Sequence, residues 1–282
     1  MFLLITLFFA SMTQASPAQS PPPAAVPELN TLMMESTFKI EGPSAKVAGQ
    51  TSIGTGFLVG RPMPTDATRS YYVLVTAAHV LADIQGDTAT LVLRIKTSTT
   101  PYQRAEHQIR VRQGATKLWM QHPSADVAVM YVPLPDNLAG RLIPQELLAT
   151  DADFQQYEFH PGDEVFTVGY PYGLESNAYG FPVLRSGRIA SHPLTPAATM
   201  KTFMVDFSVF GGNSGGPIFL NQLGRLYGGT YHIDQRVFRI LGLVSNQVTL
   251  TATGERLNVA GVVHASFIRE AIALLPPVPK FP

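Results

Sequence analysis

The sequence predicts an all-β protein, and three observations lead to this fold class. Short segments rich in β-branched and aromatic residues recur along most of the chain. Glycine, proline and aspartate separate these segments, which is typical of strands joined by turns in a β-barrel or a β-sandwich. Helical periods of about ten or more residues do not alternate with the segments, so a parallel α/β sheet is not expected.

Composition limits the size of the fold and the kind of partner. The 282 residues are 45% apolar and 14% charged, with no net charge and no cysteine. A chain of this length forms one large domain or two small ones, and it can bury most of its apolar surface without disulfides. Balanced charge argues against a nucleic-acid surface or an anionic-membrane surface, so we expect neither partner in the mature protein. The oligomeric state is left open.

The N-terminal residues 1–15 are expected to be a secretory signal peptide. Residues 1–10 are almost all apolar, a run too short to span a bilayer, and small and polar residues follow up to Ala15, where we expect cleavage. The run lacks a Lys or Arg before it, so a buried or anchoring segment is the alternative. Export without cysteine favours a secreted protein or one of the bacterial periplasm or cell envelope.

Downstream elements follow in order. Residues 16–30 are rich in proline and alanine and are expected to form an extended linker. The expected strands include residues 37–40, 56–59, 71–76, 91–95, 127–132, 164–168, 217–220 and 241–244. One helix is expected at the end, capped by Ser266 and stopped by Pro276. Its apolar face consists of Phe267, Ile268, Ala271, Ile272 and Leu275. Residues 277–282 are expected to be a loose proline-rich tail.

One glycine-rich stretch, residues 211–217, has the composition of a nucleophile loop. Four glycines surround Ser214 and a proline closes the run. Because glycine has no Cβ, such a loop can turn tightly and aim its N–H groups at one point. This arrangement suits a serine nucleophile beside an oxyanion hole. A glycine-rich turn with an incidental serine is the alternative.

A serine nucleophile needs a base, and the base needs a partner that fixes its tautomer. His79 follows an apolar strand that ends in small residues, which let other segments come close. Asp126 precedes another apolar strand, where a carboxylate is costly to bury unless it accepts hydrogen bonds. Considered one at a time, each residue is also compatible with an ordinary surface position: His79 at the end of a strand and Asp126 in a turn.

Together these motifs carry a resemblance. The order Thr76-Ala77-Ala78-His79, then Asp126-Val127-Ala128-Val129, then Gly212-Asn213-Ser214-Gly215-Gly216-Pro217 resembles the trypsin/chymotrypsin superfamily. The segments at 162–165, 169–174 and 186–189 are similar to the G-D-x-V, G-x-P-x-G-L and S-G-x-[IV] motifs of its HtrA/Deg branch. The resemblance covers about residues 37–275, and we assign residues 31–276 to a single peptidase domain.

The resemblance implies two packed six-stranded antiparallel β-barrels of the chymotrypsin type, with a C-terminal helix and the site between the barrels. His79 is then the general base, Asp126 orients it, and Ser214 attacks the substrate to form an acyl-enzyme. The backbone N–H groups of Gly212 and Ser214 line the oxyanion hole. The substrates are proteins or peptides, and no metal or organic cofactor is expected.

Two departures from the family pattern matter. Asn213 stands where zymogen-activated relatives have an aspartate that pairs with a freed N-terminus, so we expect no such activation salt bridge. HtrA/Deg proteins usually continue into PDZ domains, and this sequence ends at Pro282 without one. We therefore do not expect regulation through PDZ contacts.

The specificity pocket follows from the same resemblance. Ser208, six residues before Ser214, is expected at the pocket base, where an aspartate would select Arg or Lys. Ser245, Asn246 and Gln247 are expected on the strand that pairs with the substrate, and Gln247 stands where an open pocket has glycine. We expect a restricted, uncharged pocket that prefers small or medium apolar side chains. Ordinary loop positions for Ser208 and Gln247 are the alternative.

Two other functions are compatible with parts of the sequence. Residues 212–216 fit G-x-S-x-G, the nucleophile elbow of α/β-hydrolase esterases, and Asp234 and His264 follow in the required order. That elbow must lead into a helix, whereas residues 217–220 are expected to form a strand. A non-catalytic or regulated binding module on a peptidase fold is the other alternative.

Overall fold

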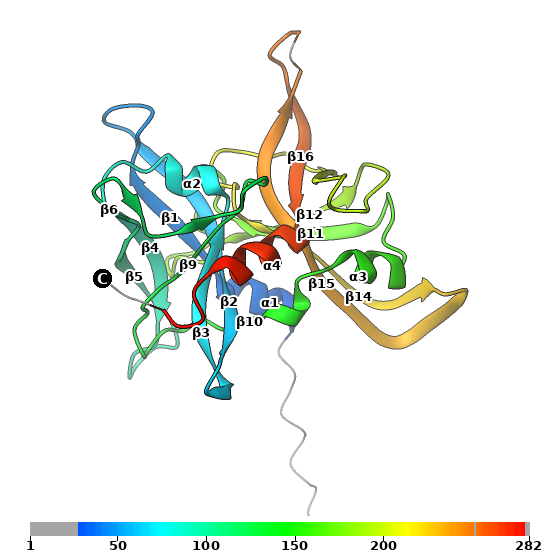
Figure 1. Cartoon of the computed structure of the whole chain (residues 1–282), viewed down its shortest axis with the longest axis horizontal. Coiled ribbons are helices and arrows are strands. Elements are labelled where there is room, and N and C mark those ends of the chain that lie inside the picture. Colours follow the sequence, from blue (N-terminus) through cyan, green and yellow to red (C-terminus); the bar gives the residue numbers. More distant parts are fainter. Residues whose placement is uncertain (1–27, 251, 280–282) are drawn as a thin grey trace, which may run out of the picture.

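The computed structural model describes residues 28–250 and 252–279. Figure 1 shows two β units side by side, the first from blue to green and the second from green to orange and red, with the red helix α4 (Ala265–Leu274) at their junction. The mostly β architecture with a C-terminal helix confirms the predicted fold class. Helix α4 contacts strands of both units, so it fixes one unit against the other.

The first unit is an eight-stranded sheet with the order β5-β4-β1-β2-β3-β9-β8, and β10 pairs with β2. Its strands are β1 (Thr37–Pro43), β2 (Thr51–Met63), β3 (Asp66–Thr76), β4 (Thr88–Ile95), β5 (Gln103–Arg110), β8 (Met120–Gln121), β9 (Ala128–Tyr131) and β10 (Ile143–Pro144). The pairs are antiparallel except for β10 with β2. The expectation of six strands in this unit is corrected to eight, because the two-residue strands β8 and β10 also join it. Strands β6 (Arg112–Gln113) and β7 (Thr116–Lys117) form a separate hairpin.

The second unit is a closed barrel of six antiparallel strands, as expected, in the order β11-β12-β13-β16-β15-β14. They are β11 (Glu164–Gly169), β12 (Val183–Ile189), β13 (Thr202–Asp206), β14 (Pro217–Tyr227), β15 (Thr230–Thr249) and β16 (Arg256–His264). Strands β14 and β15 form a long hairpin that projects from the barrel at the lower right of Figure 1. The residues after Ser214 thus continue into a strand, as the sequence predicts.

Helices are few and short, and they correct several expectations. Helix α1 (Leu29–Ser36) begins two residues inside the expected linker 16–30, and the Glu28 side chain accepts hydrogen bonds at its N-terminus. Helices α2 (Ala78–Ala82) and α3 (Asp151–Gln156) were not expected. Helix α4 starts directly after His264, so Ser266 lies inside the helix and is not its N-cap. The predicted apolar face of α4 is buried.

Two apolar clusters hold the molecule together. One fills the first unit and extends through Phe219, Phe238 and Ile240 to the apolar face of α4. The other fills the closed barrel, with Phe203, Leu241 and Val262 among its fully buried members. Because the first cluster includes residues of both units, apolar burial joins the units as well as stabilising each one.

The described residues contain no helix long and apolar enough to cross a membrane. The predicted signal peptide 1–15, the linker up to residue 27 and residues 280–282 of the tail lie outside the described residues, so those assignments stay predictions.

Candidate active site

His79 lies in helix α2, three residues after Thr76, where strand β3 ends. Ala77 and Ala78 are buried, and their small side chains let other segments approach the histidine. Its imidazole Nδ1 lies 2.7 Å from Asp126 Oδ2, and its backbone N–H donates to Asp126 Oδ1 at 3.0 Å. The His79 side chain is 37% exposed. With Nδ1 engaged by the carboxylate, Nε2 is the ring nitrogen left for a proton transfer.

Asp126 precedes strand β9 and accepts three hydrogen bonds. Besides the two from His79, its Oδ2 accepts the hydroxyl of Ser245 at 2.6 Å. Burial by itself raises the pKa of the carboxyl, but the contacts with His79 and Ser245 outweigh it and lower the pKa below its usual value. Asp126 is therefore ionised at neutral pH and suited to orient His79 and to stabilise an imidazolium.

Ser214 lies in the loop before strand β14 and is half-buried. Its hydroxyl donates to the backbone carbonyl of Ser245 at 3.3 Å, so Ser245 touches both Ser214 and Asp126. Next to it, a Cβ on Gly215 would lie 2.3 Å from Thr76 Oγ1 and 3.0 Å from the Ala77 nitrogen. The serine loop thus packs on the chain segment that leads into His79. Between the described side chains of Ser214 and His79 there is no hydrogen bond.

The peptide between Gly211 and Gly212 has a defined orientation. The Gly211 carbonyl accepts a hydrogen bond from the Tyr172 N–H at 2.6 Å. In a trans peptide the N–H points opposite to the carbonyl, so the Gly212 N–H points away from Tyr172. Gly212 has φ +95°, and a Cβ there would lie 2.1 Å from the Tyr170 carbonyl oxygen. Only glycine fits this position.

The peptide between Asn213 and Ser214 is oriented in the same manner. The Asn213 carbonyl accepts from the Gly216 N–H at 2.9 Å, which leaves the Ser214 N–H on the opposite side. Within residues 28–250 and 252–279, neither the Gly212 N–H nor the Ser214 N–H has a hydrogen-bond acceptor. Two oriented donors without acceptors beside a serine hydroxyl are what an oxyanion hole requires.

Two of the expected pocket residues, Ser208 and Gln247, form side-chain hydrogen bonds with strand β16. The Ser208 hydroxyl donates to Asn258 Oδ1 at 3.0 Å, and Gln247 Nε2 donates to the Leu257 carbonyl at 3.1 Å. Asn246 is exposed and pairs with Gly261 of β16. Ser208 and Gln247 thus reach toward the same segment of β16, and neither brings a charge.

A buried arginine, which the sequence patterns did not reveal, anchors the loop that carries Tyr172. Arg94 of β4 is fully buried, and it donates to the carbonyls of Glu35 at 3.0 Å and Gly180 at 2.9 Å. It also contacts the Tyr170 hydroxyl at 3.3 Å and lies over the Phe181 ring. Burial lowers the pKa of Arg94 and raises that of Tyr170 to about 12.

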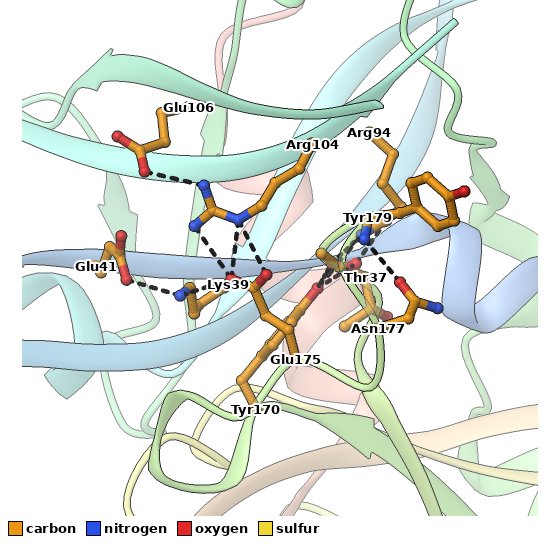
Figure 2. Close-up of polar contacts among 11 residues, drawn as sticks. Thr37, Lys39, Glu41, Arg94, Arg104, Glu106, Tyr170, Glu175, Asn177 and Tyr179 are labelled. Carbon is orange, nitrogen blue, oxygen red and sulfur yellow. Dashed lines mark hydrogen bonds and ion pairs between the residues drawn. The ribbon is translucent and has the colours of Figure 1, made fainter. Parts of the chain in front are cut away.

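Glu175 anchors the same loop from its other side (Figure 2). Its carboxylate lies 2.8 Å from Lys39 Nζ and 2.9 Å from Arg104 Nε. Burial raises the pKa of Glu175, but the two cations outweigh it and lower the pKa below its usual value. Strands β1, β4 and β5 of the first unit therefore hold residues 170–181, which position the Gly211 carbonyl through Tyr172.

Comparison with models of protein families shows to which family this chain belongs. The model of the trypsin-like peptidase domain matches residues 54–228, more than half of the chain. The chain belongs to the trypsin-like peptidase family. A search of curated proteins finds no match. Among solved structures, the chain is similar to the HtrA-type protease AlgW with tripeptide, at 13% identity and a TM-score of 0.47. That similarity covers 86% of this trypsin-like peptidase and 60% of the AlgW chain.

The fold of this trypsin-like peptidase contradicts the esterase alternative. An α/β-hydrolase needs a mainly parallel sheet and a helix after the serine, whereas Ser214 leads into β14 of an antiparallel barrel. His264, the base that the esterase requires, is 1% exposed and packs between Phe154 and Phe203 in the barrel core. It is therefore a core residue.

Proposed function

We propose that this trypsin-like peptidase is a serine endopeptidase, with His79, Asp126 and Ser214 as its catalytic triad. The observation that carries the proposal is the pairing of His79 with an ionised Asp126 beside the Ser214 loop, in which the Gly212 and Ser214 N–H groups have no hydrogen-bond acceptor among the described residues. The quoted motifs at 162–174 and 186–189 support membership of the HtrA/Deg branch.

The proposed reaction begins with a rotation of the Ser214 side chain. Its hydroxyl leaves the Ser245 carbonyl and turns to His79 Nε2, a change about one single bond. His79 then removes the proton as Ser214 Oγ attacks the peptide carbonyl, and the Gly212 and Ser214 N–H groups stabilise the oxyanion. The imidazolium gives its proton to the leaving amine. Water, activated by His79, clears the acyl-enzyme.

For substrate choice we propose small or medium apolar side chains before the cleaved bond. Ser208 and Gln247 support this, because both are uncharged and held toward strand β16. A pocket without a carboxylate gives Arg and Lys no counter-ion.

A digest of a proteome-derived peptide mixture tests the proposal. We expect new peptide ends with the wild-type protein and none with Ser214→Ala, and the cleaved bonds reveal the preferred side chain. Cleavage mainly after Arg or Lys would refute the proposed pocket. Labelling with an organophosphonate tests the remaining alternative: a folded protein that stays unlabelled and inert at neutral pH is a binding module on a peptidase fold.

A further inference from the structure

Thr55 is a buried residue of strand β2 that makes two contacts with the serine loop of the other unit. Its backbone N–H donates to the Ser214 carbonyl at 2.8 Å. Its hydroxyl donates to the Gly212 carbonyl at 2.6 Å. Thr55 is fully buried, so water cannot replace either contact without a rearrangement.

The hydroxyl of Thr55 is itself held in place. It accepts the Tyr170 N–H at 3.2 Å, and this fixes the direction in which its own hydrogen points. The Thr55 carbonyl accepts the hydroxyl of Thr76 at 2.7 Å. Since Thr76 is also buried and ends the strand before His79, the same threonine joins the serine loop to the histidine segment.

The loop needs such a contact because its peptides rotate easily. Gly211 and Gly212 have no Cβ, so the peptide planes around them have few steric limits. Tyr172 and Gly216 hold the carbonyls on either side of the Gly212–Asn213 peptide. The central peptide itself has two hydrogen bonds. Its Asn213 N–H donates to the Phe210 carbonyl at 3.1 Å within the loop, and its Gly212 carbonyl accepts the Thr55 hydroxyl, which ties it to strand β2.

We propose that Thr55 is a positioning residue for the oxyanion hole. Its hydroxyl holds the Gly212 carbonyl from strand β2. Together with the Tyr172 contact to the Gly211 carbonyl, this contact sets the conformation of Gly212, on which the direction of its N–H depends. This inference rests on the proposed function, since it assigns the two N–H groups to a tetrahedral intermediate. Thr55 does not touch the substrate in this role and acts through Gly212 alone.

The test compares Thr55→Val, which has the same shape without a hydroxyl, with Thr55→Ser, which keeps the hydroxyl. We expect Thr55→Val to lower kcat for a fluorogenic peptide about 10–100-fold with KM changed less than about twofold, because the oxyanion forms only after binding. Its affinity for a peptide aldehyde, which forms a tetrahedral adduct, falls by a similar factor. Thr55→Ser stays within about threefold of wild type.

Thr37→Val is the matched control. The Thr37 side chain is also fully buried in the first unit, and its hydroxyl donates to the Met33 carbonyl at 2.8 Å. The Thr37→Val variant loses the same buried hydroxyl, so its free energy of unfolding shows how much that loss alone destabilises the fold. If Thr55→Val does not fold, Thr55→Cys, with its weaker S–H donor, replaces it, and a kcat between those of wild type and inactive enzyme is expected.

A second readout separates this inference from the proposed function. In a ¹⁵N-labelled protein we expect Thr55→Val, and not Thr55→Ser or Thr37→Val, to broaden or split the amide signals of Gly212 and Asn213. If wild type is inert but these signals respond, the proposed function fails and the role of Thr55 stands. Wild-type kcat and unchanged signals in Thr55→Val, or equal losses in Thr55→Ser, overturn the inference.

Discussion

Ser245 and Asp126 share a short hydrogen bond, in which the Ser245 hydroxyl donates to Asp126 Oδ2 at 2.6 Å. That oxygen is also the one that contacts His79. We expect Ser245→Ala to lower kcat about tenfold, because a charged acceptor loses one of its donors. The pKa of Asp126 rises in the variant, so the acidic limb of the kcat/KM profile moves to higher pH. An unchanged profile would show that the bond has no part in the reaction.

Asp126→Asn tests the role of the carboxylate. The amide keeps the shape of the side chain but cannot stabilise an imidazolium, and its NH₂ group favours the wrong tautomer of His79. We expect kcat to fall by about 10⁴-fold with little change in KM. Unfolding by denaturant should remain close to that of wild type, and a variant with more than about a tenth of wild-type activity would contradict the triad.

Gln247→Gly tests the pocket. The Gln247 side chain reaches the Leu257 carbonyl of β16, and its removal leaves space for a larger side chain of the substrate. We expect kcat/KM to rise about tenfold for peptides with Phe or Leu before the cleaved bond, relative to those with Ala. A peptide library profile that keeps the wild-type ranking would remove Gln247 from the pocket.

Glu175→Gln tests the anchored loop. The variant leaves the buried Lys39 without its Glu175 partner and weakens the hold on Tyr172, so both Tm and kcat should fall. Glu106→Gln is the matched control, since Glu106 also contacts Arg104 but is 58% exposed. We expect the control to stay close to wild type. If both substitutions lowered Tm and kcat equally, the effect would come from the contacts with Arg104, which both glutamates share, and not from Lys39.

Acid stability depends on His264. Burial lowers its pKa from 6.5 to about 4, so the unfolded chain takes up a proton before the folded one does as the pH falls. The free energy of unfolding therefore decreases between about pH 6.5 and pH 4, by about 3 kcal/mol in all, and the contribution is constant below that range. His264→Leu should lose this part of the pH dependence in denaturant titrations, whereas the half-exposed His107→Gln should keep it.

Site residues that lie in a distinctive local sequence pattern could be proposed from the sequence alone. Ser214 lies among glycines and His79 after small residues, and these local patterns made both residues candidates, together with Asp126. The strand pattern predicted a β-barrel or a β-sandwich, and the barrels themselves were implied by the family resemblance. Thr55, Arg94 and Glu175 gave no such signal. Their neighbours in sequence are ordinary strand or loop residues, and the Gly212, Gly180 and Arg104 partners of these three residues are 71 or more positions away. Only the folded chain brings these groups together.

Helix boundaries show the same limit. The first two residues of helix α1 were assigned to the linker because the preceding prolines dominated that segment, and the rest of the helix was not expected. Burial of Leu32 and Met33 stabilises the helix in the fold. The Ser266 cap was wrong because the β16 strand runs directly into α4, and the helix starts at the end of the strand. Tertiary packing overrides local propensity at both places.

The buried guanidinium of Arg94 has a consequence for how the molecule unfolds. Its acceptors include the Glu35 carbonyl before the first β unit and the Gly180 carbonyl in the second unit. If the two units separate, the guanidinium therefore loses part of its hydrogen bonds. This loss raises the free energy of a state in which one unit is native and the other is denatured. We therefore expect denaturation to be a single cooperative transition, and we expect complementing fragments to associate before either becomes native.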